Sequence, residues 1–297
     1  MAASGLLYTF YTLTPLHAGS GDSQGVVDLP IQREKHTEFP VVFSSSLKGS
    51  LRYLFENDDG LKSFVPEIFG KEGTESSTGN VVFTDAKVLL FPVRSSEGVF
   101  KWITSPFVLR RFTEDIEFIS RAATQIGDKI DAGVTDDSAI GFKKYDVPIV
   151  LEDFVLTASD KSSDASLTNT TQLLSILFPA ASAQAAVNDR LLIVSDSVFK
   201  ELVKVGTQVI ARNELKENKI SNNLWYEEVV PPDALFYTVM RPRTKGNESI
   251  TDLGKGLTKK VVQIGGNETI GYGFVQFSAN LSEIVQADKG KEEKKKS

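Results

Sequence analysis

The stretch LTPLHAGSGDSQGVVDLPIQREKHTEFPVVFSSSLKGSLR, from Leu13 to Arg52, joins the end of a strand to the start of a helix through a long polar loop. The aromatic and β-branched residues of Leu6 to Leu16 overlap the beginning of this stretch and predict a first strand. The predicted strand ends at Pro15 and the turn cluster that begins at His17. The loop from Gly19 to Pro40 mixes glycine, proline and charged residues. Loops of that length in compact domains are usually functional or disordered.

A helix is expected from about Ser46 to Glu56, because leucines recur there at helical spacing behind serines that can cap its start. Lys48 and Arg52 are four residues apart, so both project from one face of this helix. The free amides at a helix N-terminus attract anions, which favours phosphate binding beside these two cations. The alternative is a solvated basic face, which is the interpretation that spacing alone favours.

The remaining pattern mixes strands and helices and predicts an α+β fold. Strands are expected at Asn80–Val93, Phe100–Ile103, Val147–Leu156 and Phe274–Phe277, and helices from Pro106 to about Ala122 and at Leu167–Phe178, Ser195–Val205 and Gly254–Val262. Strand, helix, strand, strand, helix, strand around one antiparallel sheet is the ferredoxin-like (RRM-like) arrangement of RNA-recognition modules, with insertions supplying the extra length. The charged, asparagine-rich segment from Arg212 to Pro232 is interpreted as a protruding β-hairpin.

Composition places the chain among ordinary globular proteins. Its 297 residues include 41% hydrophobic and 24% charged residues, which excludes disordered, collagen-like and membrane compositions. The net charge of −6 argues against non-specific coating of nucleic acid. With no cysteine and two histidines, any metal chemistry must depend on oxygen ligands. We expect no signal peptide, no membrane partner and a cytoplasmic location, since no apolar run of about 18 residues occurs.

Several residues have side chains suited to chemistry. Asp28 lies in the long loop beside apolar neighbours, where it could accept a proton, position water or bind a hard cation, or simply form a turn. His17, at the end of the first strand, could be an acid or base or a structural hydrogen-bonding group. Glu227 and Glu228 face opposite sides if they lie in a strand, so only one could share a site with Asp28. As an isolated feature this pair is expected to be surface charge.

The segment IGGNETIGYG, from Ile264 to Gly273, holds four glycines, which lets backbone amides approach a phosphate. It matches no P-loop, and no dinucleotide-binding unit follows it. This segment could therefore be a purely structural loop or the phosphate-binding loop of a nucleotide-binding enzyme.

The order of these motifs resembles the RAMP-superfamily backbone subunits of type III-B CRISPR (Cmr) effector complexes, specifically the fourth Cmr subunit. The most specific match is GVVDLPIQRE, from Gly25 to Glu34. SSSLKGSLR (Ser44–Arg52), LWYEEVVPPDALF (Leu224–Phe236) and the glycine-rich segment match the family's helix start, late acidic segment and C-terminal loop. The matches fall near both ends of the chain, so the resemblance covers its whole length.

This resemblance implies a right-hand shape, with a ferredoxin-like palm, helical insertions and a β-hairpin thumb. The thumb is expected either at Asn213–Asn223 or in the region from Phe112 to Lys144, and the sequence leaves both open. We expect residues 1–286 to form one elaborated RAMP domain and residues 287–297 to form a charged, disordered tail. Copies of the subunit would stack along a crRNA in a helical filament with other Cmr subunits, including the small subunit and the large polymerase-like subunit. The filament would cleave complementary target RNA at regular intervals. A non-catalytic crRNA-binding filament subunit is the alternative.

The resemblance also assigns roles to individual residues. Asp28 matches the aspartate that carries cleavage, either by activating a ribose 2′-hydroxyl or by holding a divalent cation, Mg²⁺ or Mn²⁺. His17 and Glu227 match positions near the cleavage site and receive supporting catalytic roles. RNA-binding roles are implied for Ser45, Ser46, Lys48, Arg52, Gly265, Gly266, Gly271 and Gly273.

The sequence departs from the family pattern at two places. Glu38 stands in HTEFP where the family has a glycine, and Phe43-Ser44 stands where proline and glycine are common. Both changes alter the loop that leads into the helix.

Overall fold

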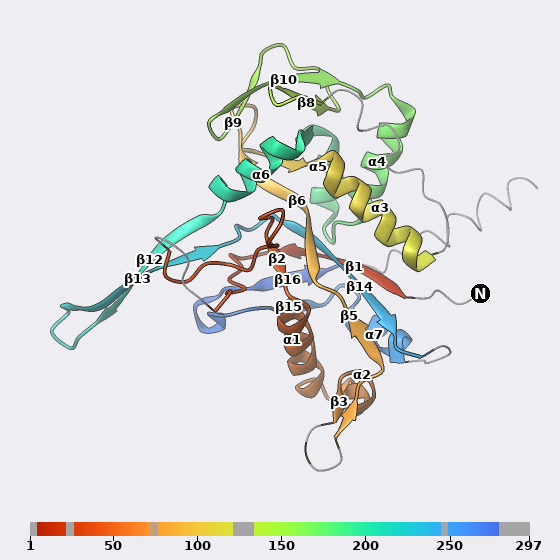
Figure 1. Ribbon diagram of the computed structural model, residues 1–297, viewed down its shortest axis with the longest axis vertical. Helices are drawn as coiled ribbons and strands as arrows, with labels where there is room; N and C mark the ends of the chain where they lie inside the picture. The colour runs from red at the N-terminus through yellow and green to blue at the C-terminus, as the bar shows by residue number, and fades with distance from the viewer. Residues whose placement is uncertain are drawn as a thin grey trace, which may run out of the picture.

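The computed structural model describes residues 5–21, 27–71, 73, 76–120, 134–244 and 249–278. Within these residues, twelve strands form one mixed sheet that runs through the molecule (Figure 1). In spatial order the path is β15 (Val261–Gln263), β16 (Phe274–Phe277), β1 (Leu6–Thr12), β14 (Leu235–Pro242), β6 (Ala86–Arg94), β7 (Phe100–Thr104), β11 (Leu191–Val194), β8 (Ser138–Gly141), β10 (Phe154–Asp160) and β9 (Ile149–Leu151). Off this path, β2 (Val41–Val42) pairs with β6 and β5 (Val81–Phe83) pairs with β14.

The centre of the sheet is the antiparallel run β16-β1-β14-β6. Phe10 of β1 lies between Phe236 of β14 and Phe277 of β16, and its ring centroid is 5.4 Å from each of theirs. The chain passes from β1 through α1 (Ser44–Glu56) to β6, and from β14 through α7 (Ser249–Leu257) to β16. These two helices meet where Gly256 of α7 fits against the ring of Phe55 of α1.

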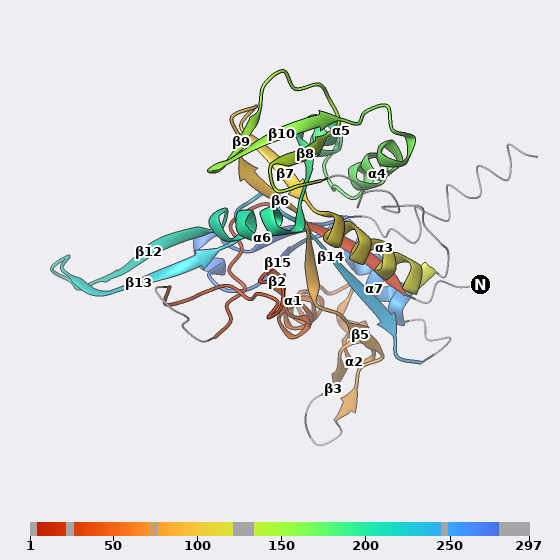
Figure 2. The ribbon, with the colours of Figure 1, turned by 45° about the horizontal axis from the view of Figure 1, so that its top comes forward.

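Two other helices, α3 (Pro106–Ser120) and α6 (Asp196–Val205), pack against β6 (Figure 2). The insertion between β7 and β11 contains α3, β8, β9, β10, α4 (Ala165–Ile176) and α5 (Ala181–Arg190). The insertion therefore contains three strands in addition to the helices that the sequence predicts for it. The expectation of a single antiparallel sheet is wrong here, since β7 pairs with β11 and β8 with β10 in parallel.

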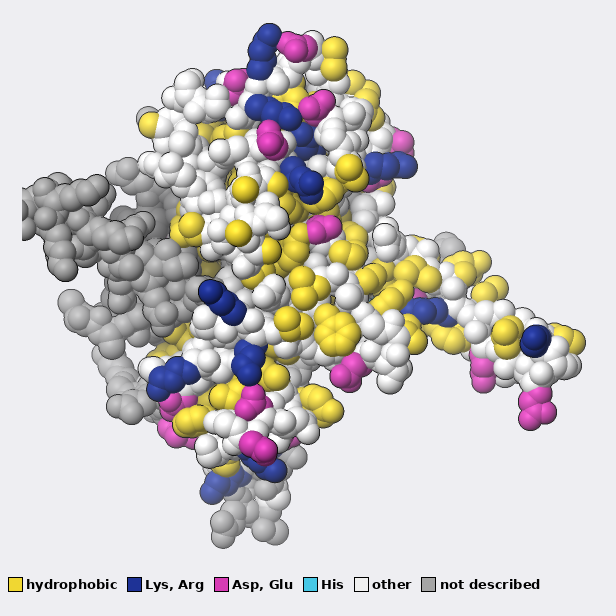
Figure 3. Space-filling model, turned by 180° about the vertical axis from the view of Figure 1, so that it is seen from behind, with side chains coloured by type: hydrophobic (Ala, Val, Ile, Leu, Met, Phe, Trp, Pro, Cys, Tyr) yellow, Lys and Arg dark blue, Asp and Glu magenta, His cyan; other side chains and the backbone are white. Residues whose placement is uncertain are grey.

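A long hairpin of β12 (Gln208–Leu215) and β13 (Ser221–Val229) projects from the body of the molecule (Figure 1). The predicted hairpin segment, Arg212 to Pro232, overlaps it, but β12 begins four residues earlier. Hydrophobic side chains continue along the hairpin from the body, as Figure 3 shows from behind. On one face the register aligns Val209, Ala211, Leu224 and Tyr226, all exposed.

Several predicted elements differ from those in the structure. The predicted strand Asn80–Val93 is two strands, β5 and β6. The predicted strand Val147–Leu156 is two strands, β9 and β10, because the chain turns at Glu152, whose φ is 51°. The predicted helix Gly254–Val262 is α7 followed by β15, with Lys259 at a φ of 60° between them. The pattern does not predict β14, although its residues up to Met240 are buried in the middle of the sheet.

The remaining short elements are η1 (Lys62–Phe64), α2 (Val65–Ile68), the small sheet of β3 (Gly70–Lys71) and β4 (Ser77–Thr78), and η2 (Glu268–Ile270). Among the helices of the described ranges, not one combines the length and apolarity that crossing a membrane requires. The predicted tail at residues 287–297 lies outside the described residues.

Candidate RNA-cleavage site at the base of the hairpin

The segment that carries Asp28 is docked on the base of the hairpin as a short parallel partner of β13. Leu29 bridges to Glu227, and the Leu29 amide donates to the Tyr226 carbonyl at 3.0 Å. The Tyr226 amide in turn donates to Asp28 Oδ2 at 2.8 Å. Asp28 is exposed, and its Oδ1 has no partner among the residues described. One oxygen is therefore fixed by the hairpin backbone, while the other has no partner among the described residues.

Glu228 holds the next part of the same segment. Its amide donates to the Leu29 carbonyl at 2.9 Å, and its Oε2 accepts from the Ile31 amide at 3.1 Å. Its Oε1 accepts from Arg33 Nη2 at 2.6 Å and from the Thr207 hydroxyl at 2.8 Å. The carboxylate is thus bonded on both oxygens and 8% exposed as a residue, so the expectation of surface charge is wrong for Glu228.

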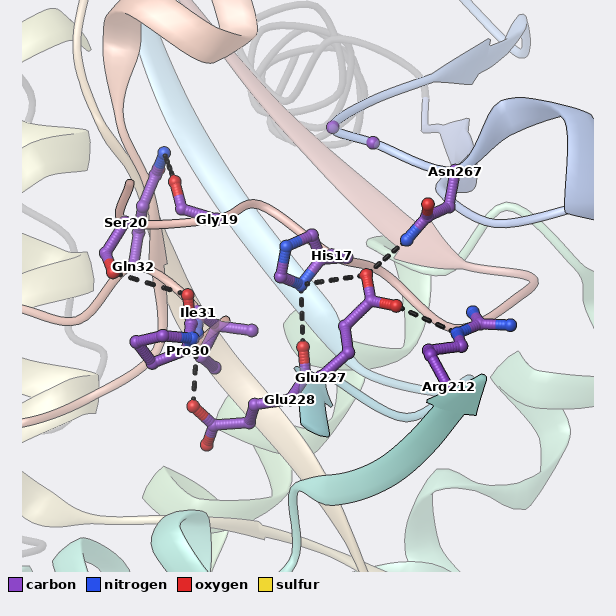
Figure 4. Close-up of polar contacts among 12 residues, drawn as sticks. His17, Gly19, Ser20, Pro30, Ile31, Gln32, Arg212, Glu227, Glu228 and Asn267 are labelled. Atoms are coloured by element: carbon purple, nitrogen blue, oxygen red, sulfur yellow. Dashed lines mark hydrogen bonds and ion pairs between the residues drawn. The ribbon is translucent and has the colours of Figure 1, made fainter. Parts of the chain in front are cut away.

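Glu227 faces the opposite side of β13, as alternation in a strand requires, and it is also buried (Figure 4). Its Oε2 pairs with Arg212 Nε at 3.0 Å, and its Oε1 accepts from the Asn267 side-chain amide. The same Oε1 lies 3.4 Å from His17 Nδ1. Glu227 thereby joins the end of the first strand, the hairpin and the glycine-rich loop.

The second contact of His17 fixes the protonation of its ring. Its Nδ1 lies 2.7 Å from the Glu228 carbonyl oxygen. Because a carbonyl only accepts, Nδ1 must carry a proton, and in the neutral ring Nε2 then has the lone pair. Nε2 faces a shallow hollow lined by His17, Gly19, Gly21, Leu29 and Pro30. Gly19 is needed there, since a Cβ at that position would lie 2.8 Å from Nε2.

The glycine-rich loop packs against the backbone of the first strand's end. The amides of Gly266 and Gly273 donate to the carbonyls of His17 and Pro15, and that of Gly271 donates to Glu268. Three of the four glycine amides are therefore used inside the chain, and RNA contacts through them stay a prediction. The same bonding speaks against the loop of a nucleotide-binding enzyme.

Gly265 has a positive φ of 82° and lies against His17, because a Cβ on it would be 2.2 Å from the His17 carbonyl oxygen. Its place in the loop is required by this close approach.

The N-terminus of α1 is capped by side chains other than the serines that the sequence predicts as caps. Helix α1 has no side-chain cap on its own residues. Instead, the Phe43 amide donates to Gln32 Oε1 at 2.6 Å and the Ser44 amide to Asp85 Oδ1 at 2.7 Å. The serine cap is therefore wrong. Gln32 also donates to Ser46 Oγ at 3.0 Å, which ties the Asp28 segment to the helix start.

The amides of Ser45 and Ser46 remain without an acceptor in the described part of the chain. One turn on, Lys48 is half-buried and makes no ion pair with any described residue. Arg52 pairs with Glu56 at 2.7 Å on the same helix. Of the two cations predicted for RNA, Lys48 is the one whose charge is not already paired within α1.

The family departure at Glu38 has a physical account. Glu38 adopts a φ of 63°, a region that favours glycine. Its carboxylate pairs with Lys204 at 2.5 Å and Lys200 at 3.0 Å, both on α6. Hydrogen bonds from Lys204 and then Lys200 lower the pKa of Glu38 to about 2. Two ion pairs to α6 therefore hold Glu38 in a backbone conformation that glycine adopts more readily.

The described residues around Asp28 do not by themselves form a metal site. In the ranges that the structure describes, no three His, Asp or Glu side chains come together in a way that could hold a cation. Asp28 offers one free oxygen, whereas Glu227 and Glu228 are already bonded to cationic or amide groups. Mg²⁺ in phosphoryl-transfer sites commonly uses one or two carboxylates with substrate phosphates and water, so a cation here would depend on the RNA for its other ligands.

Sequence reasoning missed three residues that build this site, Arg33, Arg212 and Asn267, and interpreted Glu228 as surface charge. Arg33 lies inside the diagnostic segment GVVDLPIQRE, so it could have been considered as a partner of the site. Arg212 and Asn267 carry no local signal, because they reach Glu227 only through the folded hairpin and loop.

Comparisons with known proteins identify the family. The family model described as the RAMP superfamily matches residues 9–276. The chain belongs to the RAMP superfamily. A relative from Pyrococcus furiosus, the CRISPR system Cmr endoribonuclease Cmr4, is 38% identical over 94% of this chain and 96% of its own length. The CRISPR system CMR subunit Cmr4 of Saccharolobus solfataricus is 25% identical over 91% of this chain and 98% of its own length.

A solved structure agrees with this RAMP assignment. The crystal structure of oligomeric Cmr4 from Pyrococcus furiosus matches with a TM-score of 0.74 at 33% identity, over 92% of this chain and 97% of that one. The predicted membership in the RAMP superfamily, and the similarity to the fourth Cmr subunit, are confirmed.

Proposed function

We propose that this chain is a backbone subunit of a type III-B CRISPR RNA-guided complex that stacks along the crRNA and cleaves complementary target RNA at regular intervals. The observation that carries the proposal is the full-length similarity to a Cmr endoribonuclease at 38% identity, combined with an exposed Asp28 at the base of a projecting hairpin. The partners are crRNA, target RNA, further copies of the chain, and the small and large polymerase-like Cmr subunits. The proposed location is the cytoplasm.

We infer that β1, α1, β6, β14, α7 and β16 are the ferredoxin-like palm. The inference is supported by their spatial order, β16-β1-β14-β6, because a ferredoxin-like sheet places its fourth strand beside the first and its third strand between the first and second. The elements between β7 and β14 are then insertions, and the hairpin β12–β13 is the thumb. One elaborated domain over residues 1–286 follows from this scheme.

Asp28 is proposed to promote attack of a ribose 2′-hydroxyl on the adjacent phosphorus. Its free Oδ1 accepts the hydroxyl proton and the 2′-oxygen forms a bond to phosphorus. The bond from phosphorus to the 5′-oxygen breaks, and the leaving 5′-oxygen takes a proton from water. The bond from the Tyr226 amide to Oδ2 holds the carboxylate in one orientation. A divalent cation, Mg²⁺ or Mn²⁺, is the other proposed use of Oδ1, and it would stabilise charge on the phosphate.

His17 and Glu227 are proposed to support this step. Nε2 of His17 is the atom that can exchange a proton with RNA, because Nδ1 is committed to the Glu228 carbonyl. Glu227 lies on the Nδ1 side at 3.4 Å and holds the ring in its orientation. Arg212 and Asn267 hold Glu227 in place.

Guide binding is proposed at the start of α1. The free amides of Ser45 and Ser46, the N-terminal end of the helix dipole and the ammonium group of Lys48 together favour a phosphate. Arg52 extends this face by one turn. Base pairing with the guide reads the target, so specificity requires no base-reading side chain.

The test is a denaturing gel of labelled target RNA, cut by the complex rebuilt around a matching guide, with wild type and Asp28→Ala compared in Mg²⁺ and in EDTA. We expect a ladder of regularly spaced products that disappears in the variant while the complex still assembles. A ladder that survives Asp28→Ala would leave the alternative, a non-catalytic crRNA-binding filament subunit. The EDTA lane separates the two uses of Oδ1.

A further inference from the structure

We propose that Glu228 is a positioning residue that sets the place of Asp28 through its side-chain carboxylate. The proposal rests on the proposed function, since it concerns the same site. It assigns to Glu228 a role in the rate of cleavage, distinct from assembly and from RNA binding.

The argument starts from an interrupted strand pairing. In a parallel ladder centred on Leu29 and Glu227, the Leu29 amide bonds the Tyr226 carbonyl and the Leu29 carbonyl accepts from the Glu228 amide. The next bond of such a ladder would run from the Ile31 amide to the Glu228 carbonyl. That carbonyl is taken by His17 Nδ1 at 2.7 Å. The Ile31 amide bonds the Glu228 side chain instead, at 3.1 Å.

The pairing therefore continues past Leu29 only because a side-chain carboxylate replaces a backbone carbonyl. Pro30 cannot help, since it has no amide hydrogen. Without the carboxylate, the buried Ile31 amide has no acceptor, and burying an unmatched donor costs about 1–3 kcal/mol. The segment around Asp28 would then be anchored to β13 on one side only.

A second set of contacts fixes the carboxylate itself. Arg33 Nη2 and the Thr207 hydroxyl both donate to Glu228 Oε1, at 2.6 and 2.8 Å. Arg33 also donates to the Glu38 carbonyl at 2.8 Å, and Thr207 lies at the start of the chain that leads into β12. Glu228 thus joins the Asp28 segment, the hairpin and the end of α6 at one point.

Because the hairpin and the Asp28 segment share this anchor, a displacement of either is transmitted to the other. Displacing a reacting group by about 1 Å can lower a rate by about 100-fold. Removing the anchor should therefore slow the chemical step more than it weakens the binding of RNA.

The experiment compares Glu228→Ala, Glu228→Gln and Asp28→Ala with wild type in the reconstituted complex. Single-turnover cleavage of labelled target is measured against the concentration of complex, which separates the rate at saturation from the half-saturating concentration. We expect Glu228→Ala to lower the saturating rate by about 10- to 100-fold with the half-saturating concentration changed less than twofold. Glu228→Gln keeps one oxygen for the Ile31 amide but loses the charge that pairs with Arg33, so its saturating rate should lie between those of wild type and Glu228→Ala.

Controls separate the possible failures. Glu97→Gln removes a glutamate that pairs with Lys143 in the insertion, at 3.2 Å, and should cleave as wild type does. If Asp28→Ala cleaves normally, the proposed function fails. If Asp28→Ala is inactive while Glu228→Ala and Glu228→Gln cleave at the wild-type saturating rate, only the role of Glu228 is overturned. If Glu228→Ala does not assemble, Glu228→Gln decides, and a wild-type rate at saturation refutes the proposal.

Discussion

Replacing Gly265 by alanine puts a methyl group against the backbone of His17, and Gly271 in the same loop provides a matched control. The two glycines have nearly equal φ values, 82° and 84°. A Cβ at Gly265 would lie 2.2 Å from the His17 carbonyl oxygen, whereas a Cβ at Gly271 would meet nothing within 4 Å. The two substitutions therefore share the conformational penalty and differ in the steric one.

The magnitude follows from these two contributions. The left-handed conformation costs an alanine about 1–2 kcal/mol, which is the whole loss expected for Gly271→Ala. At Gly265 the loop must also move away from His17, which breaks the bond from the Gly266 amide to the His17 carbonyl, 2.9 Å in length. A lost hydrogen bond of this kind adds about 0.5–1.5 kcal/mol. We expect Gly265→Ala to lose about 1.5–3.5 kcal/mol in all.

Urea unfolding of the isolated chain measures this difference. With a slope of about 3 kcal/mol/M, an extra loss of about 1 kcal/mol moves the midpoint of Gly265→Ala about 0.3 M below that of Gly271→Ala. The slope itself should not change. Equal midpoints for the two variants would refute the reasoning that the loop is locked onto the end of the first strand.

Three further predictions concern the site and its surroundings. Gly19→Ala places a Cβ 2.8 Å from His17 Nε2, so single-turnover cleavage should slow by roughly tenfold or more with assembly intact; an unchanged rate would show that Nε2 need not be open. Lys48→Ala should reduce the slope of log K for guide binding against log salt concentration by about 0.7. Arg52→Ala should reduce this slope less, because the charge of Arg52 is already paired with Glu56. Filter binding at several salt concentrations checks both. Glu38, whose pKa is lowered to about 2 by its two lysine partners, stabilises the fold above its ordinary pKa of 4.5 and ceases to do so as the pH falls towards 2. The Tm of Glu38→Gln should therefore lie below wild type at pH 7 and converge with it between pH 4.5 and 2, and a constant difference would contradict this.

The sequence predicted those features that depend on short spacing. The helix at Ser44–Glu56 follows from its leucine repeat, and Phe274–Phe277 agrees with the predicted final strand. The opposite orientation of Glu227 and Glu228 follows from strand alternation alone. The GVVDLPIQRE motif identified the segment that carries Asp28.

The rest depends on contacts between distant segments. His17 Nδ1 meets the Glu228 carbonyl across 211 positions, and no periodicity encodes that distance. A serine side chain was expected to cap the start of the helix, but the Ser44 amide there donates to Asp85, 41 residues away. Both glutamates looked like surface charge because their cationic and amide partners come from other elements. Tertiary packing, not local propensity, decides these positions.

The central claim is that this chain cuts target RNA with Asp28, and the most direct measurement is guided cleavage by the rebuilt complex with wild-type and Asp28→Ala chains. The account predicts a ladder of regularly spaced products for wild type, and no ladder for Asp28→Ala in complexes that contain the same amount of guide and bind the same amount of target. An undiminished ladder from the Asp28→Ala complex would contradict the account and place the cleaving group elsewhere.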